Sequence, residues 1–226
     1  MSTIFVSSTF TDMHYERDAI QQLVAPQVNE AARKYGQTVS FCDLRWGIDT
    51  QGYDSPTASR KVLDVCLDEI DRSDPPMVVL LGYRYGWTPA LDIQDLPGET
   101  HEQALQRKVD PLLQASRRKN MQLDNLEISV TELEVRYGGL AASGRRMPLL
   151  CYFREIDSNP EIPYSYLPED EAHFARLNDL KQRIARVAGG QLRTYHLQPD
   201  DNGSIQATMA NFSALLARDV IDFFKT

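Results

Sequence analysis

Hydroxyl side chains that follow the first apolar run of the chain are candidates for holding a phosphate. Ser7, Ser8 and Thr9 come directly after residues 4–6, whose β-branched and aromatic side chains favour a buried strand. In an open parallel sheet, ligands bind outside the carboxyl ends of the strands. Hydroxyls and free backbone N–H groups at such an end, joined by the guanidinium of Arg84, would hold a phosphate or pyrophosphate. Capping of the next helix by the same hydroxyls explains the spacing equally well.

A second group combines a carboxylate, guanidiniums and aromatic rings. Asp43, Arg45 and Trp46 follow the apolar run 38–42, and Arg84 and Tyr85 follow the next predicted strand. Aromatic and arginine side chains at strand ends can stack on a base or close a cleft. Packing of the sheet rim, with Arg45 paired to a nearby carboxylate, is the alternative. The sequence contains neither a Walker loop nor a G-x-G-x-x-G fingerprint, which argues against nucleotide kinases and dehydrogenases.

Two glutamates lie in a helical pattern that begins after Ser129. Ser129 and Glu132 form an S-x-x-E capping box. At 100° per residue, Glu134 falls beside Val130 on the apolar side of this helix, and Glu132 points nearly opposite. A carboxylate on the apolar side of a helix raises the free energy of the folded state unless it forms an ion pair or serves in a reaction. The pattern therefore assigns Glu132 to the cap and leaves Glu134 either in a reaction or in an ion pair with an arginine.

Composition limits the class of protein. The chain has 226 residues, of which 42% are hydrophobic and 25% are charged, as expected for a folded protein of one large or two small domains. A net charge of -8 argues against nucleic acid as a partner. Three cysteines without metal-type spacing indicate a reducing compartment, and Asp12, His14 and Glu16 cannot converge on one metal ion from a regular helix. Without a signal peptide or a membrane-spanning run, we expect a cytoplasmic protein.

Apolar runs alternate with helical stripes along the whole chain, which predicts an α/β fold with βαβ units. We expect a flavodoxin-like sheet of five parallel strands in the order 2-1-3-4-5, with helices on both faces and residues 77–81 near its centre. Pro26 should kink or split the first helix, and the last helix should be core structure. The organisation is predicted as one domain over 1–226, with a core over 1–153 and the last strand and helices over 154–226. The predicted strands are residues 4–6, 38–42, 77–81, 148–153 and 192–197.

Four motifs, in this order, resemble one uncharacterised family. They are V-S-S-T-F-x-D-M-x-x-E-R-D from Val6, D-L-R-W-G-I from Asp43, R-Y-G-W from Arg84 and S-V-T-E-L-E from Ser129. This family occurs at the amino terminus of STAND-type NTPases with NACHT modules. It is itself similar to Toll/interleukin-1 receptor (TIR) domains and, more remotely, to nucleoside deoxyribosyltransferases.

The resemblance implies a TIR-like effector domain of a defence or signalling protein that binds a nucleotide such as NAD⁺. In TIR enzymes, a glutamate on the helix before the fourth strand cleaves the nicotinamide–ribose bond, with NAD⁺ as substrate and no cofactor required. Carried onto this chain, the resemblance places that glutamate at Glu134 or Glu132. The helical pattern favours Glu134, because it falls on the apolar side of the helix. Ser7–Thr9 and Arg84 would then hold the phosphates, and Trp46 or Tyr85 would stack on a ring. The alternatives are a non-catalytic module that self-associates, beside an NTPase module, and a deoxyribosyltransferase-like enzyme.

Overall fold

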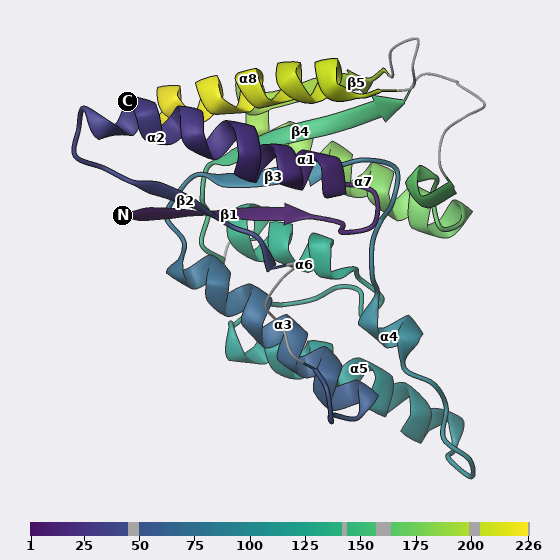
Figure 1. Cartoon of the computed structure of the whole chain (residues 1–226). Helices are drawn as coiled ribbons and strands as arrows, with labels where there is room; N and C mark the ends of the chain where they lie inside the picture. Colours follow the sequence, from purple (N-terminus) through teal and green to yellow (C-terminus); the bar gives the residue numbers. More distant parts are fainter. Residues whose placement is uncertain (45–49, 142–143, 157–163, 199–203, 226) are drawn as a thin grey trace. The chain divides into compact units, whose positions relative to one another are not determined.

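The computed structural model describes residues 1–44, 50–141, 144–156, 164–198 and 204–225. Its centre is one parallel sheet with the strand order β2-β1-β3-β4-β5, and this order confirms the prediction (Figure 1). β3 is central and fully buried, and its Val78 pairs with Val6 of β1 and with Leu150 of β4. The strands are β1 (Ser2–Ser8), β2 (Val39–Cys42), β3 (Met77–Leu81), β4 (Leu149–Ile156) and β5 (Leu192–Leu197).

The chain divides into two compact units. The first comprises Met1–Asp43, Ser73–Tyr85 and Met147–Thr226, and it contains all five strands. The second comprises Leu44–Arg72 and Gly86–Arg146 and is helical. The organisation as a single domain over 1–226 stays a prediction.

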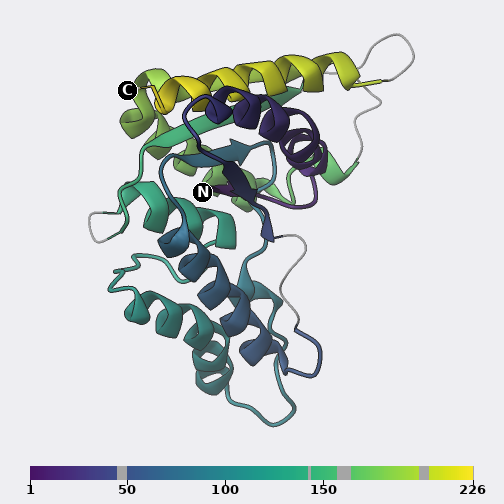
Figure 2. The same cartoon turned by 60° about the vertical axis from the view of Figure 1, so that its left-hand side comes forward.

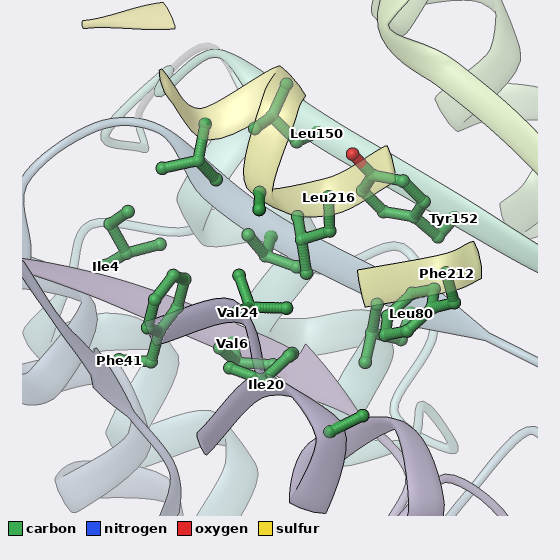
Figure 3. Close-up of a cluster of buried hydrophobic side chains, with 14 of the residues drawn as sticks. Ile4, Val6, Ile20, Val24, Phe41, Leu80, Leu150, Tyr152, Phe212 and Leu216 are labelled. Carbon is green, nitrogen blue, oxygen red and sulfur yellow. The ribbon is translucent and has the colours of Figure 1, made fainter. Parts of the chain in front are cut away.

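Helices cover both faces of the sheet within the first unit. Successive side chains of a strand point to opposite faces. Ile4, Val6, Leu80 and Tyr152 belong to a buried cluster that also contains residues of the first and last helices (Figure 3). Phe153, the neighbour of Tyr152, instead lies against a helix that follows β4. The helices of the first face are α1 (His14–Ala19), η1 (Ile20–Val24), α2 (Ala25–Arg33) and α8 (Gln206–Phe223), and the helix of the second face is α7 (Glu171–Ala188).

Just before Pro26, the predicted first helix changes from π-helical to α-helical hydrogen bonding, and the helical backbone continues through Val24 and Ala25. Proline has no amide hydrogen to donate, so the regular i to i−4 ladder is interrupted at this residue. The five residues of η1, immediately before α2, form a π-helix. Gly36 adopts a φ of 67° just after α2, a left-handed conformation that suits glycine at a helix end.

The last helix is core structure, which confirms the prediction. α8 lies beside α2 in both views (Figures 1 and 2). Its apolar residues recur at three- and four-residue spacing, so one side of α8 faces the sheet. The buried members are Met209, Phe212, Leu216, Ala217 and Val220.

The second unit consists of helices and includes the charged segment 99–119. α3 and α5 pack along each other, and Arg118 and Lys119 at the end of α5 pair with Asp68 of α3. Thr100 begins α5 through a capping box with Gln103. In the described part of the chain, no helix combines the length and apolar character needed to cross a membrane. The elements are α3 (Ser55–Arg72), α4 (Pro89–Asp92), α5 (His101–Arg118), α6 (Val130–Val135) and η3 (Arg136–Leu140).

Candidate functional site at the carboxyl ends of the strands

Arg17 ties together the ends of β1 and β2. Its side chain is 2% exposed, and its Nη1 donates to Asp43 Oδ1 at 2.5 Å. Its Nε donates to Ser8 Oγ at 2.7 Å, and its Nη2 donates to the Ser8 carbonyl at 3.1 Å. A guanidinium that donates in several directions at once fixes its partners in place. Two of the predicted ligand-binding residues, Ser8 and Asp43, are therefore held by a buried cation.

The hydroxyls after β1 are engaged within the protein. Ser8 Oγ donates to the Thr9 carbonyl at 2.9 Å, and Thr9 Oγ1 donates to the carboxylate of Asp12. Ser7, Ser8 and Thr9 are all buried. The residue that caps α1 is Met13, which makes no side-chain cap hydrogen bond. The hydroxyls thus organise the turn after β1 through Arg17 and Asp12, a role that neither of the two sequence interpretations anticipated.

A fully buried arginine lies at the centre of this region. Arg154, near the end of β4, has a side chain that is 0% exposed. Its Nη2 donates to Asp12 Oδ2 at 2.9 Å, and its Nη1 donates to Glu16 Oε1 at 3.1 Å and to the Asp12 carbonyl. Tyr195 of β5 donates its hydroxyl to the same Glu16 oxygen at 2.6 Å, and the ring of Tyr166 lies 4.5 Å from the guanidinium carbon. The cluster joins α1 to β4 and β5.

Burial and charge compete in this cluster. Burial raises the pKa of Asp12, and the nearby Arg154 guanidinium opposes that rise. Burial would lower the pKa of Arg154, but Glu16, Tyr195 and Asp12 hold it above its ordinary value. Burial also raises the pKa of Tyr195 well above its usual range, so this phenol stays a hydrogen-bond donor. The charges of the cluster thus depend on one another, as in a buried ion pair.

Gly82, directly after β3, leaves room for this ion pair. A Cβ placed on Gly82 would lie 2.5 Å from Asp12 Oδ2 and 2.8 Å from Arg154 Nη2. Gly82→Ala should therefore push the two partners apart and destabilise the protein by roughly 1–3 kcal/mol, the usual cost of overpacking. The measurement is the free energy of unfolding in urea. Gly190→Ala is the matched control, because nothing lies within 4 Å of a Cβ at Gly190; an equal loss in both variants would contradict the prediction.

Glu169 holds Arg84 and Tyr85 in the loop after β3. Glu169 Oε1 lies 3.3 Å from Arg84 Nε, and Glu169 Oε2 accepts from the backbone N–H of Tyr85 at 3.1 Å. Arg84 also donates to the Leu167 carbonyl at 3.2 Å. Tyr85 is buried and lies against the ring of His173. Arg84 and Tyr85 are thus fixed in the described structure by the segment that leads into α7.

Both glutamates of the catalytic prediction lie in the second unit. Ser129 Oγ accepts from the Glu132 N–H at 3.1 Å and caps α6, which confirms the Ser129 half of the predicted capping box. The carboxylate of Glu132 is 3% exposed and pairs with Arg136 at 2.6 Å. Glu134 is buried too, as are all the other residues from Thr131 to Val135. The two carboxylates are therefore both shielded from solvent, although the helical pattern predicts only Glu134 on the apolar side of the helix.

The structure brings together part of the predicted site. Ser8, Thr9 and Asp43 meet around Arg17 and Asp12, and Arg84 and Tyr85 meet at Glu169, all within the first unit. Arg45 and Trp46 lie outside the described residues. A meeting of Glu134 with Ser7–Thr9 or Arg84 would join the two units and stays a prediction. Among the described residues, no group of His, Cys, Asp and Glu has an arrangement that could hold a metal ion.

Arg17, Asp12, Glu16 and Arg154 are the residues that the motif analysis did not assign to the site. The first three have a signal in the sequence, because they lie in the motif that begins at Val6 and continues beyond the end of β1. Arg154 has no such signal, since its partners lie 138 and 142 residues away.

The sheet order, the helices on both faces and the polar strand ends define a flavodoxin-like α/β domain. Residues 3–207 match the model of the family described as domain of unknown function DUF4062, and the chain belongs to this family. No solved structure matches the chain.

Similar segments occur in much longer proteins. The chain is 34% identical over 199 residues to telomerase protein component 1 of Rattus norvegicus, which covers 85% of this chain and 7% of that protein. It is 28% identical over 187 residues to a TPR repeat-containing protein of Dictyostelium discoideum, and the match covers 81% of this chain and 10% of that protein. It is 32% identical over 116 residues to NACHT and WD repeat domain-containing protein 2 of Mus musculus, and the match covers 50% of this chain and 6% of that protein. The chain is thus related to a small part of proteins that include NACHT and WD repeat proteins.

Proposed function

We propose that this chain is a TIR-like signalling domain that acts through self-association beside a NACHT-type NTPase module. The relationship to NACHT and WD repeat proteins supports a signalling role. The TIR-like character rests on the four sequence motifs and agrees with the flavodoxin-like strand order. In this proposal the domain transmits a signal by contact with other copies of itself.

The observation that favours an interaction module over nucleotide binding is the pairing of polar groups at the strand ends. Ser8 and Thr9 bond to Arg17 and Asp12, and Arg84 pairs with Glu169. A phosphate at these groups would have to replace existing buried bonds, and breaking such bonds carries a desolvation cost. The described geometry therefore favours a structural role for these residues over phosphate binding.

Sedimentation velocity over a range of protein concentrations tests self-association directly. We expect the weight-average sedimentation coefficient to rise with concentration as the domain forms dimers or larger assemblies. NAD⁺ is added to the same samples, and nicotinamide is measured by chromatography. Assembly without nicotinamide supports the interaction module, whereas a monomer at every concentration contradicts it.

Cleavage of NAD⁺ is the second candidate function, and the burial of Glu134 favours it. A buried carboxylate fits a group that stabilises an oxocarbenium-like centre or forms a covalent ribosyl intermediate. Attack of the carboxylate on the ribose carbon would break the nicotinamide–ribose bond, and water would then release ADP-ribose. The residue assignment itself comes from the TIR resemblance.

Glu134→Gln should lower any nicotinamide release by at least about a hundredfold, because the amide keeps the size of the side chain and removes its charge. Glu132→Gln is the matched control on the same helix. Arg136 keeps Asp124 as a partner at 2.5 Å, so this variant should retain the fold and the activity. Circular dichroism establishes that both variants are folded. Turnover at the wild-type rate in Glu134→Gln would overturn the assignment, and an essential Glu132 would transfer it to that residue.

A further inference from the structure

The cluster around Arg154 contains more buried carboxyl groups than cations. Asp12 and Glu16 both have side chains that are 0% exposed, and both face the one guanidinium of Arg154. If both carboxyl groups were ionised, one negative charge would remain in the interior without a partner. A buried charge without a partner is very costly, and a carboxyl group avoids that cost by keeping a proton. The balance of charges thus indicates that the folded chain carries a proton in this cluster.

The other described groups that face the cluster do not balance this charge. Lys181 of α7 faces it together with Glu155 of β4, so this pair adds no net charge. The ring of His14 on α1 lies at the Thr11 carbonyl, with its Nδ1 3.3 Å from that oxygen. The excess of one negative charge therefore remains. The remaining groups are uncharged and come from the turn after β1, from β5 and from the 3₁₀-helix η4 (Tyr164–Tyr166): the hydroxyls of Thr9 and Tyr195 and the ring of Tyr166.

Hydrogen-bond geometry selects Asp12 as the residue that holds this proton. Asp12 Oδ1 lies next to the Thr9 hydroxyl, and a hydroxyl can accept a hydrogen bond as well as donate one. Glu16 Oε1 already accepts from Arg154 and from Tyr195. In the described structure, Glu16 Oε2 is buried and has no hydrogen-bond partner. A proton on Glu16 Oε2 would therefore lack an acceptor, whereas a proton on Asp12 Oδ1 would bond to Thr9.

We propose that a proton on Asp12 latches the start of α1 onto β4 and β5, and that its release to water at higher pH loosens this contact. With the proton bound, Asp12 Oδ1–H donates to Thr9, and one carboxylate faces the guanidinium of Arg154. After its release, two buried carboxylates share that guanidinium and repel each other. Burial raises the pKa of Asp12, although Arg154 opposes the rise, and this direction agrees with the geometry. The proposal is independent of the proposed signalling function.

Asp12→Asn mimics the protonated acid, because its amide nitrogen can donate to Thr9 while its oxygen accepts from Arg154. Above the ordinary aspartate pKa of about 3.9, the folded wild type binds more protons than the unfolded chain, so its stability falls as the pH rises. Urea titrations of the full chain at about pH 5 and about pH 8 give the equilibrium constants of unfolding. The ratio of the wild-type constant to that of Asp12→Asn should rise at least about threefold between these pH values. A smaller rise, a constant ratio or a fall overturns the proposal, since an Asp12 that is always ionised gives that result.

Asp43→Asn is the matched control, because it also removes a buried carboxylate from a guanidinium. Asp43 is 6% exposed and faces Arg17 as one carboxylate to one guanidinium. These two charges balance, so the folded chain has no need of a proton there. The corresponding ratio for Asp43→Asn should stay within about twofold over the same pH range. An equal rise for both variants would show that the effect is not specific to Asp12, and the proposal would fail.

Two further measurements follow the proton and the latch separately. Carbon-13 NMR of the aspartate carboxyl groups gives the titration midpoint of Asp12, whose signal is identified by its absence in Asp12→Asn. We expect a midpoint above the ordinary value of about 3.9, and a midpoint at or below that value contradicts the bound proton. Hydrogen–deuterium exchange of α1 (His14–Ala19) at about pH 8 should be at least about threefold faster in the wild type than in Asp12→Asn. Equal exchange in the two proteins contradicts the latch.

Discussion

Replacing Arg154 with methionine should destabilise the protein by roughly 3–5 kcal/mol, the cost of leaving buried charges without their partner. Asp12 and Glu16 both have side chains that are 0% exposed, and both accept from this guanidinium. Methionine fills much of the space but donates no hydrogen bond. The two carboxylates would then be buried beside each other without a cation, which raises the free energy of the folded state.

Unfolding in guanidinium chloride measures this loss as a lower midpoint with an unchanged slope. Arg193→Met is the matched control on the adjacent strand β5. Arg193 pairs with Asp219 at 3.1 Å, but its side chain is 34% exposed, so the loss should stay within about 1 kcal/mol. Arg154→Met combined with Glu16→Gln should recover part of the stability, because one buried charge is removed. Equal losses for Arg154→Met and Arg193→Met would show that burial does not increase the contribution of the Arg154 ion pairs to the free energy of unfolding.

Phe212→Ala should destabilise the protein by roughly 3–5 kcal/mol, as expected for deletion of a buried aromatic ring. Phe212 is 2% exposed on α8. Its ring meets Tyr152 edge-on, with the ring centres 5.7 Å apart (Figure 3). The ring centre of Tyr195 lies 5.1 Å from that of Phe212. Truncation would open a cavity between α8 and the strands β4 and β5, and the rigid sheet can close it only in part.

Phe224→Ala is the matched control, because Phe224 follows the end of α8 and is 38% exposed. Its loss should be roughly 0.5 kcal/mol in the same denaturant titration. A loss near zero for Phe212→Ala would instead indicate that this side of α8 faces outward in solution, as an assembly surface. Sedimentation velocity on the same variant would then show whether self-association changes.

The sequence by itself determined the elements and their order. The apolar runs became five parallel strands, and residues 77–81 form the central strand because that run is apolar on both faces. The first helix contains a π-helical turn just before Pro26, which has no amide hydrogen to donate, and Ser129 caps α6 because its hydroxyl accepts from the Glu132 N–H. These features depend on local chemistry and on periodicity, which are written in neighbouring residues.

Only the tertiary structure decided how the polar residues at the strand ends are used. Asp12 and Glu16 meet Arg154 and Tyr195 across 138 to 179 residues of sequence, so no local spacing could indicate these pairs. Glu132, expected opposite the apolar side of its helix, is buried with Arg136 because α6 is enclosed all round. Periodicity reports which residues share a side of a helix, but burial depends on what packs against each side. That packing is set by the whole fold, and it placed the hydroxyls, carboxylates and arginines of this protein in bonds with one another.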